Sequence, residues 1–192
     1  FSAFAIPDRI YDCDLATHER VLRKEEEIPS GHDPDQYISH RVTATAPDGE
    51  SVPISLFHHR DIAPDADTPL ILYGYGAYGM SELPAFSPNR LSLVNRGFVY
   101  AIAHVRGGKE KGDRWYRRGK LAYKENTFID CIAAAEALIA AGYTGTGRIA
   151  LHGGSAGGML VGAVLNRRPE LFHAAVADVA FVDVLNTMLD AE

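Results

Sequence analysis

Several features that define other classes of protein are scarce or missing in this sequence. No stretch reaches the roughly 18 uncharged apolar residues of a membrane-spanning helix, so we expect no membrane insertion. Only two cysteines occur, Cys13 and Cys131, and their wide separation indicates no disulfide framework. Cys131 falls on the apolar face of an expected helix, so we expect a buried, unreactive thiol. We also expect no metal ion and no cofactor.

Runs rich in lysine or arginine are missing as well. The chain has 19 Lys and Arg residues against 25 Asp and Glu residues, a formal net charge of −6. This balance disfavours a nucleic-acid surface and favours cationic ligands. With 46% apolar and 23% charged residues over 192 positions, the composition is that of a globular protein with one sizeable core.

An initiating methionine is also missing, since the chain begins at Phe1. The last residue is Glu192. We expect truncation at both ends, so the lack of a signal peptide carries no information. The expected location is the cytoplasm.

The most informative stretch reads as strand, sharp turn and helix. Apolar residues Ile149–Leu151 form the expected strand, and residues 159–165 form the expected helix, which ends before Pro169. Between them, Gly153–Gly157 fits the pattern G-x-S-x-G of a nucleophile elbow. The simpler alternative is a glycine-rich turn with an incidental serine. A P-loop is excluded, because no Lys-Ser/Thr pair follows.

A nucleophile elbow needs small neighbours for its serine, because strand and helix approach closely there. Four glycines meet this need: Gly153, Gly154, Gly157 and Gly158. The turn would place the Ser155 hydroxyl near the positive end of the following helix. It would also aim the N–H of Ala156 at a developing oxyanion.

The remaining pattern predicts an open α/β sheet. Residues 39–46 and 52–57 read as an antiparallel hairpin. Further strands are expected at 70–73, 97–103 and 174–178, and further helices at 91–95 and 126–141. Two antiparallel strands followed by alternating parallel strands and helices are typical of the α/β class. In the longest helix, Thr127 and Asp130 resemble a capping box.

The first 36 residues differ from the rest. Residues 9–17 and 20–23 predict a hairpin, and residues 24–34 read as a polar linker. Because a lone hairpin is not stable, we expect this one to belong to a larger sheet.

A second glycine cluster lies at Tyr73–Gly79. Its glycines formally satisfy G-x-G-x-x-G after a strand. A dinucleotide fold would then need a helix and an acidic residue after the next strand, but a loop follows and that strand ends in His104–Arg106. The alternative is the loop in which α/β-hydrolases place a second oxyanion donor. A phenol is a neutral donor at pH 7, so the residues alone leave Tyr73, Tyr75 and Tyr78 as candidates.

These motifs occur together in a specific order along nearly the whole chain: Tyr73–Gly79, Gly97–Gly108, Asn126–Asp130, Gly153–Gly158 and Phe181–Asp190. In this order they resemble the prolyl oligopeptidase family of serine peptidases, and most closely its oligopeptidase B branch. The resemblance implies the N-terminal half of an α/β-hydrolase catalytic domain at residues 37–192. It also implies that residues 1–36 are a remnant of the last blade of a β-propeller with its linker.

The resemblance further implies a serine endopeptidase that cleaves short peptides after Arg or Lys through an acyl-enzyme. Ser155 matches the nucleophile, Tyr75 the phenolic oxyanion donor and Ala156 the backbone donor. The acidic residues of the specificity pocket would lie beyond Glu192. In the loop 81–85 only Glu82 is acidic. The expected partners are short peptides and the missing propeller and C-terminal half of the same chain.

The triad of α/β-hydrolases runs Ser, then Asp or Glu, then His. His173 alone follows Ser155, at the start of the next strand and with no room for an acid-bearing loop between them. We therefore expect the base and the acid outside this chain, and residues 1–192 alone to be inactive. The preceding histidines are expected to be structural or at the surface: His58, His59, His104 and His152.

Competing functions remain open. The same elbow serves esterases and lipases, and a prolyl-specific oligopeptidase or a non-catalytic binding member is also compatible with the motifs. Arg106 either orders the loop near the active site or forms a structural ion pair. Residues 110–118 alternate in charge and are expected to be solvated surface, anchored by Trp115 and Tyr116.

Overall fold

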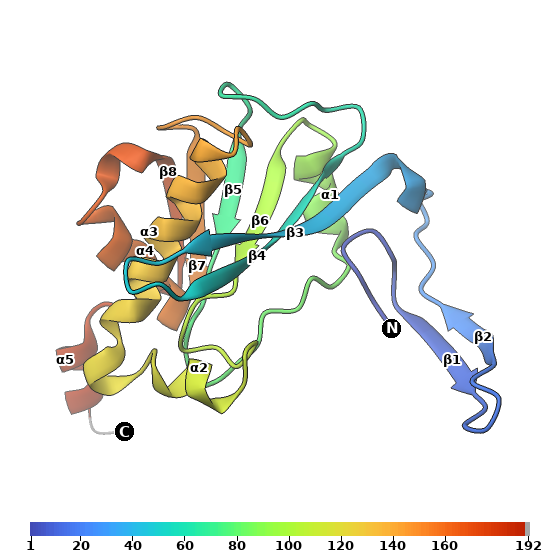
Figure 1. Ribbon diagram of the computed structural model, residues 1–192, viewed down its shortest axis with the longest axis horizontal. Coiled ribbons are helices and arrows are strands. Elements are labelled where there is room, and N and C mark those ends of the chain that lie inside the picture. The colour runs from blue at the N-terminus through green and yellow to red at the C-terminus, as the bar shows by residue number, and fades with distance from the viewer. Residues whose placement is uncertain (191–192) are drawn as a thin grey trace.

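The computed structural model describes residues 1–190 and contains a six-stranded sheet and a separate two-stranded hairpin (Figure 1). The strands are β1 (Arg9–Cys13), β2 (Arg20–Glu25), β3 (Tyr37–Thr45), β4 (Ser51–His59), β5 (Leu70–Tyr73), β6 (Val99–Ala103), β7 (Ile149–Gly154) and β8 (Phe172–Asp178). The helices are α1 (Pro88–Val94), α2 (Asp113–Arg117), α3 (Glu125–Ala140), α4 (Ala156–Leu165) and α5 (Val184–Leu189). Short 3-10 turns occupy Pro34–Gln36, Leu121–Tyr123 and Pro169–Leu171.

The strands of the large sheet lie in the order β3-β4-β6-β5-β7-β8. β3 and β4 form an antiparallel hairpin, β4 is antiparallel to β6, and β6, β5, β7 and β8 are mutually parallel. This arrangement confirms the expected α/β class. It also brings the carboxyl ends of β5 and β7 to one edge of the sheet.

Side chains of successive strand residues point to opposite faces of the sheet, so the strands contribute to a hydrophobic core on each face. On β4, Leu56 joins the cluster beneath α3 and α4, whereas Phe57 joins the cluster beneath α1. β6 divides in the same way, with Ala101 in the first cluster and Tyr100 in the second. Cys131 is fully buried in the first cluster, as expected.

The predicted capping box at the start of α3 is wrong. Lys124 occupies the N-cap position, and no side chain caps the helix. Thr127 donates instead to the carbonyl oxygen of Arg106 at 2.7 Å, and Asp130 pairs with the side chain of Arg106. The two side chains have bonded to a neighbouring loop because that loop packs against the first turn of the helix.

The expectation of a solvated surface at residues 110–118 is only partly met. The segment contains the short helix α2, and Trp115 is buried with its indole N–H donating to the carbonyl oxygen of His104 at 3.1 Å. The carboxylate of Glu110 also turns inward and accepts from the N–H of Glu82 at 3.0 Å. Trp115 therefore packs as predicted, whereas Glu110 does not face solvent.

The hairpin of β1 and β2 forms at the predicted residues and stands apart from the large sheet, at the side where the N-terminus lies (Figure 1). The residues before it lie differently, because Phe4 is buried and stacks on Phe57 with ring centroids 5.1 Å apart. The domain boundary between residues 36 and 37 stays a prediction, and residues 191 and 192 of the expected catalytic domain lie outside the described residues. Between residues 1 and 190, no helix has the length and apolar character needed to cross a bilayer.

Candidate active site

Ser155 lies on the turn between β7 and α4 in a conformation that few side chains adopt. Its φ of 51° and ψ of −114° are strained for a residue with a Cβ atom, and its side chain is exposed. Neighbouring backbone holds this conformation: the N–H of Ser155 donates to the carbonyl oxygen of Asp178 at 2.8 Å, and its own carbonyl oxygen accepts from the N–H of Phe181 at 3.0 Å. The turn presents the hydroxyl outward.

The hydroxyl of Ser155 is not used by the helix that follows it. Ser155 occupies the N-cap position of α4, yet its side chain makes no capping hydrogen bond. Ala156 is the first residue of α4, and a backbone N–H at this position has no hydrogen-bond partner within the helix. Positive potential at this helix end favours an anion beside Ser155.

At three of the four elbow glycines, neighbouring atoms lie too close to leave room for a Cβ atom. A Cβ on Gly153 would lie 2.4 Å from the carbonyl oxygen of Gly157, and a Cβ on Gly157 would lie 2.7 Å from that of Gly74. A Cβ on Gly158 would lie 2.6 Å from the Cβ of Ala180. Gly154 differs, because its nearest neighbour would be the Cβ of Asp178 at an ordinary 3.7 Å.

The three candidate tyrosines take different positions beyond β5. Tyr73 packs edge-on against His152 with ring centroids 5.3 Å apart, and burial raises the pKa of its phenol to about 12. Tyr78 has a φ of 57° and is exposed. Tyr75 lies against the first turn of α4, since its ring carbon Cδ2 would be 3.4 Å from a Cβ on Gly157. Burial also raises the pKa of Tyr75, so its phenol is a neutral donor at pH 7.

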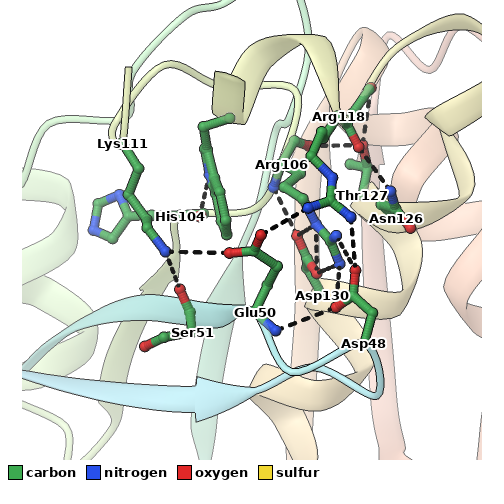
Figure 2. A network of polar contacts seen from close by, with 12 residues as sticks. Asp48, Glu50, Ser51, His104, Arg106, Lys111, Arg118, Asn126, Thr127 and Asp130 are labelled. Atoms are coloured by element: carbon green, nitrogen blue, oxygen red, sulfur yellow. Dashed lines mark hydrogen bonds and ion pairs between the residues drawn. The ribbon is translucent and has the colours of Figure 1, made fainter. Parts of the chain in front are cut away.

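A buried ion pair joins Arg106, which follows β6, to Asp130 of α3 (Figure 2). Arg106 and Asp130 are both fully buried, with the guanidinium Nη2 2.6 Å from the carboxylate Oδ1. The N–H of Arg106 also donates to Asp130 at 2.9 Å, and Asp48 accepts from the other side of the guanidinium. Burial opposes the charge on Arg106, but the hydrogen bonds to Asp130 and Asp48 raise its pKa. Of the two alternatives for Arg106, the structural ion pair is present.

A cavity of about 510 Å³ opens beside the elbow. Its walls combine apolar side chains with two lysines: Tyr78, Lys120, Lys124, Ala156, Met159 and Phe181. The cavity therefore reaches from the first turn of α4 to the start of α3, and a group bound there would lie beside Ser155.

Neither His173 nor His104 is placed to supply a base to Ser155, and His152, three residues before Ser155, pairs through Nε2 with Asp178 at 3.4 Å. His173 lies near the start of β8, whereas Asp178 at the end of that strand pairs with Gly154. Five residues of strand separate the two positions, which is about 16 Å. His104 is buried, with Nε2 2.7 Å from the Ser55 hydroxyl. Within residues 1–190, no group of three His, Cys, Asp or Glu side chains is placed to hold a metal ion.

Sequence reasoning missed Lys124, whose ammonium donates to the carbonyl oxygen of Gly76 at 2.6 Å. One signal was available. A cation at the N-terminus of a helix opposes the helix dipole, so a lysine at that position points to a partner elsewhere.

Comparisons with known proteins point to one family. The model of the prolyl oligopeptidase family matches residues 84–192. A dipeptidyl aminopeptidase BI from Pseudoxanthomonas mexicana is 44% identical over 191 residues, which are 99% of this chain and 26% of that protein. Oligopeptidase B from Leishmania major superposes with a TM-score of 0.92 at 46% identity, over 98% of this chain and 26% of that one.

Oligopeptidase B from Trypanosoma brucei, solved in its closed form with covalently bound antipain, gives a TM-score of 0.92 at 48% identity. The match covers 98% of this chain and 27% of that one. The chain thus spans about a quarter of the length of the relatives it matches.

Proposed function

Because this chain belongs to the prolyl oligopeptidase family of serine peptidases, we propose that it forms the nucleophile-bearing part of an endopeptidase that cleaves short peptides after arginine or lysine. The observation that carries the proposal is the strained, exposed Ser155 at the head of α4, with Tyr75 packed against the same turn. The net charge of −6 suits a cationic substrate.

In the proposed reaction, Ser155 Oγ attacks the carbonyl carbon of the scissile peptide bond. The oxyanion that develops accepts hydrogen bonds from the Ala156 N–H and the Tyr75 phenol. The amine then leaves, and water hydrolyses the ester formed on Ser155. The general base and the acid that orients it lie outside residues 1–190 in this proposal. The triad order Ser, then Asp or Glu, then His excludes the histidines before Ser155, and His173, which follows it, is at the wrong end of β8.

Two further features are part of the proposal. Residues 1–36 belong with a β-propeller that adjoins the catalytic domain, and the hairpin of β1 and β2 would extend one of its blades. Both cysteines are free, which suits a reducing compartment such as the cytoplasm. The main alternatives are a prolyl-specific oligopeptidase and an esterase. The tyrosine run in place of an HGGG segment disfavours the esterase.

The test uses protein expressed from the complete reading frame that contains this sequence. A fluorophosphonate probe should label the wild type on Ser155 and leave Ser155→Ala unlabelled. Peptides of equal length with Arg, Lys or Pro before the scissile bond, together with a simple ester, then define the specificity. Absence of labelling would favour a non-catalytic binding role, and preferential cleavage after Pro would favour the prolyl alternative.

A further inference from the structure

We propose that Lys124 is a positioning residue for the oxyanion hole, because its ammonium holds the carbonyl of Gly76 and so fixes the backbone next to Tyr75. This role rests on the proposed function, since the position of the phenol matters only if Ser155 forms an acyl-enzyme. Lys124 lies just before α3, 48 residues further along the chain than Gly76.

The peptide that Lys124 holds is enclosed on its other sides. Gly76 has a φ of 72°, and a Cβ there would lie 2.4 Å from Cγ2 of Thr127 and 2.7 Å from Cγ2 of Val105. A Cβ on Gly107 would lie 2.0 Å from the Gly76 carbonyl oxygen. That oxygen is therefore confined between a neighbouring backbone and the ammonium at 2.6 Å.

Lys124 occupies an unfavourable place for a cation. It stands at the positive end of α3, and burial lowers the pKa of its amine to about 8. The titratable groups that line the same cavity are Lys120, Tyr78 and Tyr116, and no carboxylate among residues 1–190 lines it. The Gly76 carbonyl is thus the hydrogen-bond acceptor that compensates this cation, and a charge-assisted bond is among the stronger kinds.

The contact acts on Tyr75 through the chain. Before Tyr75, the N–H of Gly74 donates to the carbonyl oxygen of His152 at 3.1 Å, which ties the loop to β7. After Tyr75, Lys124 holds Gly76, and the N–H of Gly79 donates to the carbonyl oxygen of Gly107 at 2.9 Å. Removing the hydrogen bond from Lys124 to Gly76 frees the peptide adjacent to Tyr75. A displacement of the phenol by about 1 Å is enough to lower turnover about 100-fold.

The experiment is a double-mutant cycle in the complete reading frame that contains this sequence. Lys124→Met keeps most of the side-chain volume and removes the donor. We expect it to lower kcat about 10- to 100-fold with a change in KM of about twofold or less. In a Tyr75→Phe background, where the phenolic donor is already gone, the same change should lower kcat by about twofold or less. The matched control is Lys111→Met, which removes a lysine that donates to the carbonyl oxygen of Ser51 at 2.9 Å. That variant should leave kcat unchanged.

The pH profile gives a second readout. The ammonium is protonated below its pKa of about 8, so kcat should fall as pH rises through that value. Lys124→Arg keeps the charge to higher pH and should remove this part of the alkaline decline, with most of the activity retained. If Lys124→Met fails to fold, this comparison decides the matter.

Three results would overturn the role of Lys124: wild-type kcat in Lys124→Met, an equal loss in both Tyr75 backgrounds, or the same alkaline limb in Lys124→Arg. Failure of the proposed function looks different, because fluorophosphonate would then not label the wild type on Ser155. Labelling of the wild type combined with any of the three results removes only the positioning role.

Discussion

Replacing Gly153 by alanine tests the close approach that builds the elbow. The new Cβ would lie 2.4 Å from the carbonyl oxygen of Gly157, 2.6 Å from its carbonyl carbon and 2.9 Å from the carbonyl oxygen of Gly74. Ordinary contacts begin near 3.4 Å, so β7 and the first turn of α4 must separate by about 1 Å. All three neighbours are backbone atoms, so no side-chain rotation relieves the clash.

Two consequences follow from a separation of this size. Inserting a methyl group into a packed site costs about 1–3 kcal/mol of folding free energy. A shift of about 1 Å between Ser155 and the Ala156 N–H lowers turnover about 100-fold. We therefore expect Gly153→Ala to reduce both the rate of fluorophosphonate labelling and kcat/KM by about 100-fold, with a lower midpoint of thermal unfolding.

The adjacent glycine provides a matched control for the same chemical change. A Cβ on Gly154 would meet its nearest neighbour, the Cβ of Asp178, at 3.7 Å, and Gly154 is not among the glycines with positive φ. Gly154→Ala should therefore label and turn over within about twofold of the wild type. Wild-type rates in Gly153→Ala, or equal losses in both variants, would refute the close-approach reasoning.

Three further predictions concern single groups. Tyr75→Phe should lower kcat about 100-fold with little change in KM, measured by steady-state kinetics on an arginyl peptide; an unchanged kcat would exclude the phenol from the oxyanion hole. Asp130→Asn should destabilise the fold by about 3 kcal/mol in urea unfolding, because Arg106 would keep its buried charge with Asp48 as its remaining acidic partner; a midpoint like that of the wild type would contradict this. Iodoacetamide at pH 8 should modify exposed Cys13 and spare Cys131, because burial raises the pKa of Cys131 to about 12; peptide mapping that finds both thiols modified at similar rates would refute the assignment.

Much of the fold followed from patterns within single elements. The apolar run Leu70–Tyr73 forms β5 at the predicted residues, and the hairpin predicted at 39–46 and 52–57 appears as β3 and β4. Most boundaries shifted by up to three residues, because apolar periodicity and backbone hydrogen bonding do not begin and end at the same residue. For example, α4 starts at Ala156 rather than at residue 159. Helix α2 was not predicted, because most of its residues are charged and Trp115 is its single buried side chain.

The contacts of the candidate site were less accessible to sequence reasoning. Thr127 and Asp130 have the spacing of a capping box, but Arg106 binds both, from 21 and 24 residues earlier in the chain. The choice of Tyr75 over Tyr73 and Tyr78 came only from the family resemblance. In the structure, Tyr75 is the tyrosine whose ring packs against Gly157.

The sequence by itself determined the α/β class, the strand–turn–helix around Ser155 and the family, because each depends on periodicity and spacing within short segments. Only the tertiary structure decided which side chains meet: Arg106 with Asp130, Lys124 with the carbonyl of Gly76, and Tyr75 with the first turn of α4. The physical reason is that hydrogen bonds and close contacts act over a few ångströms. Partners distant in the chain are therefore fixed by how helices and loops pack on the sheet, and local sequence does not encode that packing.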